Sequence, residues 1–178
     1  MKKAMMILSD YVEDLESLGT RDLLIRANIS VDTYSYTNYN IVTSHNLEIK
    51  CDYLLSEIND IKNYDLLIIP GGPWVEKTIN DDYQLIELIK KFRKDSKLIC
   101  AICAAPLFLN KANILKEKEY TCFKGLEQQI DGIKKDADSV LDDNILTSRN
   151  AFSVFSFSEL IISTVLGQKA LIDFKKQY

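Results

Sequence analysis

The segment from Leu98 to Leu107 constrains the fold more than any other part of the chain. An apolar run of strand length ends directly before Cys103, small residues follow, and Pro106 stands at the start of a helical pattern. This order is typical of a strand-to-helix turn that holds a nucleophile at the edge of a sheet. Because a helix N-terminus offers backbone N–H groups and partial positive charge, the pattern predicts a Cys103 thiol pKa well below the free value of about 8.5.

Cysteines in apolar runs more often fill a protein core than react, and Cys100 fits that description. For Cys103, which follows the run, both interpretations stay open. The two residues form a C-x-x-C pair, but Cys100 lies inside the predicted strand. Their separation of roughly 10 Å along a strand is too long for a disulfide. A redox pair or a zinc half-site is therefore not favoured, and no metal is expected.

Composition and charge narrow the class of protein. The 178 residues suit one domain, and 47% hydrophobic with 27% charged residues is typical of a globular protein. A net charge of −4 argues against nucleic acid as a partner. The first apolar run stops at Ser9-Asp10, which is short for a signal peptide, and no run has the length of a membrane span. Four cysteines without regular spacing favour the reducing cytoplasm.

Apolar runs of strand length alternate with helical patterns along the chain, which predicts an α/β fold with a mostly parallel sheet covered on both faces. The predicted strands are 4–8, 29–36, 47–49, 64–69, 98–102, 119–123, 140–141 and 145–147, and the predicted helices are 13–27, 81–92, 106–115, 152–166 and 170–176. In such sheets ligands bind beyond the carboxyl ends of the strands. Three of these ends lie at Ser9-Asp10, Gly71-Gly72 and Cys103. The glycines form no G-x-G-x-x-G pattern, so no nucleotide cofactor is predicted.

Glu16 is the carboxylate best placed to act with Cys103. On the first predicted helix it shares a face with Thr20, Leu23 and Ala27, which predicts an inward side chain, although a single glutamate more often lies on a solvated face. A buried carboxyl group tends to stay protonated, and it then donates a hydrogen bond to a neighbouring thiolate.

Three further features have both a functional and an ordinary interpretation. Gly71-Gly72 offers N–H donors beside a ligand or forms a simple turn. Arg149, between a predicted strand and a helix, binds an anion or makes a surface ion pair. His45 is the single histidine and lies in a polar segment far from Cys103 in sequence. It is either plain surface or a base that the fold or a partner subunit brings to the cysteine.

Four segments together resemble the DJ-1/ThiJ/PfpI superfamily, and its DJ-1-like branch in particular, essentially from end to end. They are Glu13-Asp14-Leu15-Glu16, Leu67-Ile68-Ile69-Pro70-Gly71-Gly72, Ala101-Ile102-Cys103-Ala104-Ala105-Pro106 and Leu146-Thr147-Ser148-Arg149. The resemblance implies a single domain over residues 1–178 with a flavodoxin-like three-layer sandwich, and a homodimer.

The resemblance also implies the roles of the site. It makes Cys103 an oxidation-prone cysteine, Glu16 its protonated partner, and Gly72 and Ala104 backbone donors near the sulfur. Members of the superfamily are described as oxidative-stress sensors, cofactor-independent glyoxalases, disputed deglycases, chaperones and proteases. Some bacterial relatives carry a thiazole-monophosphate biosynthesis label, which no residue here supports.

Three departures from the family pattern affect these expectations. Ala105 stands where relatives usually have glycine, and Cys122 stands where many have a histidine near the cysteine. His45 matches an arginine that approaches the partner subunit's cysteine in close relatives. The missing histidine argues against a peptidase, because an amide leaving group needs an acid. Two hypotheses stay open: a weak glyoxalase for a small reactive carbonyl compound, and a non-enzymatic redox sensor that responds to an oxidant.

Overall fold

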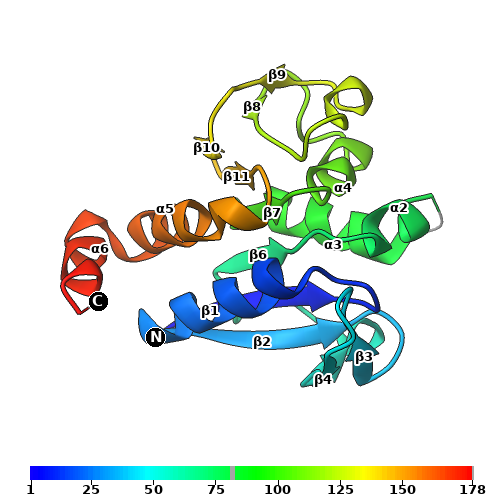
Figure 1. Cartoon of the computed structure of the whole chain (residues 1–178), viewed down its shortest axis with the longest axis horizontal. Helices are drawn as coiled ribbons and strands as arrows, with labels where there is room; N and C mark the ends of the chain where they lie inside the picture. The colour runs from blue at the N-terminus through cyan, green and yellow to red at the C-terminus, as the bar shows by residue number, and fades with distance from the viewer. Residues whose placement is uncertain (81–82, 178) are drawn as a thin grey trace.

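A seven-stranded sheet runs through the middle of the computed structural model, which describes residues 1–80 and 83–177 (Figure 1). Across the sheet the strands follow the order β10 (Ser139–Asp142), β11 (Ile145–Ser148), β7 (Leu98–Ile102), β6 (Leu66–Ile69), β1 (Lys2–Leu8), β2 (Ile29–Ser35) and β5 (Tyr53–Leu54). Neighbouring strands are parallel except for the antiparallel hairpin of β10 and β11. The predicted α/β class and mostly parallel sheet are confirmed.

The central strands are continuous apolar runs because helices cover both faces of the sheet. Every residue of β6 and the run from Ala4 to Leu8 in β1 is at most 1% exposed. The register pairs Met6 with Ile68 and Ile68 with Cys100, so these three buried residues lie in one row across the sheet. Cys100 is therefore a core residue.

Two groups of helices pack against the sheet. In one group α5 (Val154–Leu166) contacts both α1 (Thr20–Arg26) and α6 (Gln168–Lys175), and in the other α3 (Tyr83–Lys94) contacts α4 (Pro106–Lys111). Short helical turns complete the chain: a π-helical turn η1 (Leu15–Gly19), α2 (Trp74–Thr78) and the 3₁₀ turns η2 (Leu55–Glu57), η3 (Glu127–Gln129) and η4 (Ala151–Ser153). Among the described residues, no helix combines the length and apolar character needed to cross a bilayer.

Several predicted boundaries are wrong, mainly where chain segments leave the sheet. The strand predicted at 47–49 is β4 (Glu48–Lys50), which pairs with the unpredicted β3 (Asn40–Val42) in a separate ribbon rather than at the sheet edge. The strand predicted at 119–123 is only β8 (Glu119–Tyr120), which pairs with β9 (Ile133–Lys134). These segments are half polar, so periodicity carries little signal.

Helix ends also differ from the prediction. The helix predicted at 106–115 ends at Lys111, and Asn113 follows with a φ of 58°. The helix predicted at 13–27 is a π-helical turn continued by α1, and α2 was not predicted at all. The start of the helix predicted at 81–92 falls on residues 81 and 82, which lie outside the described residues. From residue 83 that helix is present and ends at Lys94.

The topology brings the carboxyl ends of β1, β6, β7 and β11 to one edge of the sheet, since these strands are parallel. The chain runs from β1 outward to β2 and β5 and then crosses to β6 on the other side of β1. The strand order therefore reverses between β1 and β6. Such a switch point leaves a crevice where ligands bind in open α/β sheets.

Candidate functional site

Cys103 directly follows β7 and takes up a strained backbone conformation. Its φ is 66°, a left-handed value that is uncommon for a residue with a side chain and costs of the order of 1–3 kcal/mol. Two hydrogen bonds hold it there. Its N–H donates to the carbonyl oxygen of Ser148 at 2.9 Å, and its carbonyl oxygen accepts from the N–H of Phe123 at 2.8 Å. The chain therefore turns sharply at Cys103, and neighbouring segments fix the turn.

Glu16 lies in η1, the π-helical turn that follows β1, and its side chain is buried, with 1% exposure. It is hydrogen-bonded to the Cys103 side chain, and its Oε2 accepts from the N–H of Gly71 at 2.9 Å. The N–H of Glu16 in turn donates to Oε2 of Glu13 at 2.6 Å. Single π-helical turns inside helices are frequent at functional sites, and here the turn directs a carboxyl group inward.

The loop after β6 approaches the pair so closely that only glycine fits. A Cβ on Gly71 would lie 2.7 Å from the Cys103 Cβ and 2.8 Å from Oε2 of Glu16. Gly72 has a φ of 111°, and a Cβ there would lie 2.5 Å from the carbonyl oxygen of Tyr11. The absence of side chains lets the N–H of Gly72 reach the sulfur of Cys103, which also accepts from the N–H of Ala104.

Burial raises the pKa of Glu16 to about 7, and the nearby charge of Glu13 adds to the effect, although the hydrogen bonds from Cys103 and Gly71 act in the opposite direction. Burial also raises the pKa of the Cys103 thiol, and the charge of Glu16 raises it further, against the lowering effect of the Ala104 and Gly72 N–H groups. The sequence predicted a lowered pKa for the Cys103 thiol. This prediction is wrong, because burial and the charge of Glu16 together outweigh the two N–H groups.

The two groups titrate as one unit because each changes the charge that the other experiences. The pair releases its first proton near pH 7, the pKa of Glu16. The proton that remains is shared along the hydrogen bond between the carboxylate and the sulfur. Glu16 is thus placed to take the proton of Cys103 when the sulfur attacks, without any other base.

A pocket of about 500 Å³ opens beside Cys103, which is partly exposed. Glu13, Pro73, Glu76, Phe123 and Lys124 contribute to its walls together with Gly72, Ala104, Gly125 and Leu126. Such a volume suits a small molecule. Glu13 was not predicted as a site residue, because acidic side chains are common at helix starts and the sequence does not distinguish it from its neighbour Asp14.

His45 does not line this pocket. It lies after β3 on an exposed loop, with its Nδ1 3.0 Å from Oδ2 of Asp14. Burial acts to raise the pKa of Asp14, but hydrogen bonds from Thr43, His45 and Ser44 together lower it. His45 is therefore tied to the outer surface of the turn that carries Glu16, and within one chain it is not a partner of Cys103.

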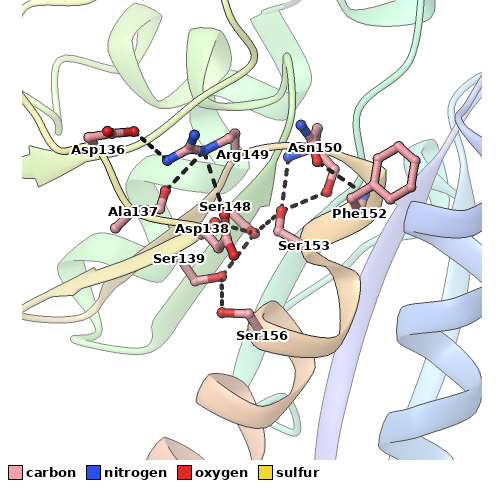
Figure 2. A network of polar contacts seen from close by, with 10 residues as sticks. All are labelled: Asp136, Ala137, Asp138, Ser139, Ser148, Arg149, Asn150, Phe152, Ser153 and Ser156. Carbon is pink, nitrogen blue, oxygen red and sulfur yellow. Dashed lines mark hydrogen bonds and ion pairs between the residues drawn. The ribbon is translucent and has the colours of Figure 1, made fainter.

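Arg149 contacts the loop that carries Asp136 and Ala137 (Figure 2). It is not one of the residues that line the pocket. Its guanidinium group donates to Oδ1 of Asp136 at 2.7 Å and to the carbonyl oxygen of Ala137 at 3.3 Å. The neighbouring Ser148, whose carbonyl oxygen holds Cys103, joins a chain of serine hydroxyl groups. Its Oγ lies 2.8 Å from that of Ser153 and 2.9 Å from that of Ser139. The surface ion pair is the interpretation that these contacts favour for Arg149.

The other three cysteines are free and buried. Burial raises the pKa of Cys122 to about 11, and the charges that act on it are those of Glu127 and Lys134. The Cys122 thiol donates to the carbonyl oxygen of Phe123 at 3.4 Å. In the described part of the chain, no group of three histidine, cysteine or acidic side chains is arranged to hold a metal ion.

The raised pKa of Glu16 predicts a pH-dependent stability. Between the unperturbed pKa of 4.5 and about 7, the folded protein binds more protons than the unfolded chain. The free energy of unfolding therefore falls as pH rises through this interval, by roughly 3 kcal/mol. We expect urea denaturation at pH 4.5 and 7.5 to show this loss in the wild type and not in Glu16→Gln. Glu76 is exposed, so Glu76→Gln is the control and should show the same pH dependence of the unfolding free energy as the wild type. Equal pH dependence in wild type and Glu16→Gln would contradict the assignment.

Comparisons with known proteins identify the family and support the fold. The model of the DJ-1/PfpI family matches residues 2–164. Protein DJ-1 homolog B of Arabidopsis thaliana is 27% identical over 97% of this chain, which spans 40% of that protein. Glutathione-independent glyoxalase DJR-1.2 of Caenorhabditis elegans is 28% identical over 93% of this chain and 90% of its own length. A crystal structure of the C103A mutant of the DJ-1 superfamily protein STM1931 from Salmonella typhimurium has a TM-score of 0.90 and 27% identity, covering 99% of this chain and 96% of that one. The chain belongs to the DJ-1/PfpI family.

Proposed function

We propose that the protein converts small 2-oxoaldehydes to 2-hydroxy acids without a cofactor, with Cys103 as nucleophile and Glu16 as proton carrier. The observation that carries the proposal is the hydrogen-bonded pair of Cys103 and Glu16, which loses its first proton near pH 7 beside an open pocket. A relative of similar length is named as a glutathione-independent glyoxalase, which supports this class of reaction.

The chemistry needs only these two side chains and water. The Cys103 sulfur adds to the aldehyde carbon while its proton passes to Glu16 and from Glu16 to the new alkoxide oxygen, which gives a hemithioacetal and leaves Glu16 ionised again. The Glu16 carboxylate takes the proton from that carbon, which gives an enediol, and returns it to the neighbouring carbon. The hydroxyl proton of the first carbon moves to the oxygen of the second, so the thioester of a 2-hydroxy acid forms. Water hydrolyses the thioester, releases the hydroxy acid and returns the proton to the pair. The N–H groups of Gly72 and Ala104, which face the sulfur, are the nearest backbone donors to the reacting centre.

Turnover of methylglyoxal tests this mechanism directly. We expect lactate formation by the wild type, none by Cys103→Ser, and a loss of at least about 100-fold in Glu16→Gln. Because Glu16 must be ionised to accept the thiol proton, the rate should rise with pH and level off above about 7. Cys122→Ser is the matched control and should keep wild-type turnover. Peptide substrates should not be cleaved, since the only histidine, His45, lies at Asp14 rather than in the pocket.

A redox sensor is the second candidate, because Cys103 is the one partly exposed thiol while the other three are buried. Peroxide would oxidise it first to a sulfenate and then to a sulfinate. Protonated Glu16 and the two N–H donors would hold the added oxygens. Absence of methylglyoxal turnover together with selective sulfinate formation at Cys103 would overturn the enzymatic proposal in favour of this one. Four free thiols favour the cytoplasm as the compartment for either role.

We further propose that the protein is a homodimer, with an apolar surface formed by η1, α1, η4 and α5 at the interface. Leu15, Ile25, Phe152 and Phe155 are between 42% and 97% exposed in the single chain. These elements also pack on one another, since α5 contacts α1, η1 and η4. Clustered exposed apolar side chains of this kind mark interaction sites.

The dimer proposal predicts the effect of one charge on this surface. Phe155→Asp should convert the protein to a monomer in light scattering at micromolar concentration, while the fold measured by circular dichroism is kept. Tyr83→Asp, at an 84% exposed position on α3, is the control and should stay dimeric. A wild type with monomeric mass would contradict the proposal.

A further inference from the structure

We propose that Trp74 is a positioning residue for the reactive pair: its indole N–H orients the two consecutive peptide groups whose own N–H groups hold Glu16 and Cys103. The inference deepens the proposed function, because it rests on the pairing of these two side chains.

The Trp74 side chain points back from the start of α2 into the loop after β6. Its Nε1 lies 3.0 Å from the carbonyl oxygen of Gly71 and 3.2 Å from that of Pro70, so one N–H is shared between two acceptors. The side chain is 1% exposed, and its ring lies against Phe108 and Tyr36, with centroid distances of 5.1 and 6.0 Å. The indole is therefore held in one position by the core.

Both carbonyl groups belong to peptide groups that face the reactive pair. The Pro70 carbonyl shares its peptide plane with the N–H of Gly71, which donates to Oε2 of Glu16 at 2.9 Å. The Gly71 carbonyl shares its plane with the N–H of Gly72, which donates to the sulfur of Cys103. Because a peptide group is planar and rigid, a donor that fixes the carbonyl also fixes the direction of the N–H on the opposite side.

The indole also affects the strength of these donors. A hydrogen bond to a carbonyl oxygen polarises the peptide group and makes its N–H a better donor. The anionic form of the pair accepts from both N–H groups, so Trp74 stabilises it relative to the fully protonated form. The loop has other support, since the N–H of Glu13 donates to the Gly71 carbonyl oxygen at 3.0 Å. Loss of the indole donor is therefore expected to weaken the two contacts rather than to abolish them.

The chain contains one tryptophan, which permits a replacement of a single chemical group. Growth of a tryptophan auxotroph on β-(3-benzothienyl)alanine exchanges the indole N–H for sulfur in a ring of the same shape. Growth on 5-fluorotryptophan keeps the N–H and is the matched control. In each protein we would measure the rate of Cys103 alkylation by iodoacetamide as a function of pH, with mass spectrometry to identify the modified residue.

We expect the midpoint of the alkylation profile to be about half a pH unit higher in the benzothienyl protein than in the fluorotryptophan protein. Glu13 is the other carboxyl group whose charge acts on Glu16, and it is unchanged in both proteins. Phe92→Leu, at a buried position near the end of α3 that leads into β7, loosens the core away from Trp74. It should lower the melting temperature and leave the midpoint in place.

Equal midpoints in the two labelled proteins would overturn the proposal, and so would a shift of similar size in Phe92→Leu. The readout does not depend on turnover. A protein without glyoxalase activity that still shows the shift would reject the proposed reaction and keep the role of Trp74.

Discussion

The hydrogen bond between the Glu16 carboxyl group and the Cys103 sulfur is the interaction around which this edge of the sheet is organised. Two ionisable groups lie side by side in a largely buried place, so neither can ionise independently of the other. Glycine at position 71 is a condition of that contact, because a single Cβ there would overlap both partners. The chemistry proposed for the protein follows from one proton shared between carboxylate and thiol.

The topology explains how residues far apart in sequence form this contact. Glu16 follows β1, Gly71 follows β6 and Cys103 follows β7, and these strands are parallel neighbours in the sheet. Their carboxyl ends meet where the strand order reverses. The strained φ of Cys103 is tolerated because backbone hydrogen bonds from β11 and from the segment after β8 fix both sides of its turn. The stability of the sheet thus holds the cysteine in a conformation that the local sequence does not favour.

The fold and the contact between Glu16 and Cys103 were largely predictable from the sequence, whereas the electrostatics of that contact were not. Continuous apolar runs such as Leu66–Ile69 identify buried parallel strands, and the helix face of Glu16 indicates its inward direction. The pKa of Cys103 was predicted to be lowered by N–H groups at a helix N-terminus. Burial and the charge of Glu16 raise this pKa by more than those N–H groups lower it, and the sequence pattern shows neither effect. Trp74 directly follows the turn Pro70-Gly71-Gly72-Pro73, and this position in the sequence indicates that it lies near the site. Its hydrogen bonds to two carbonyl groups depend on the direction of the side chain, which sequence periodicity does not reveal.

The most direct test of this account is a carbon-13 NMR titration of the Glu16 side-chain carboxyl group in the wild type and in Cys103→Ser. We expect a wild-type midpoint near pH 7, far above the ordinary value of 4.5. In Cys103→Ser the midpoint should stay raised by burial, but the sulfur should no longer contribute to the titration at higher pH. A wild-type midpoint near 4.5 would mean that Glu16 is solvated and independent of Cys103, and it would contradict the shared-proton site.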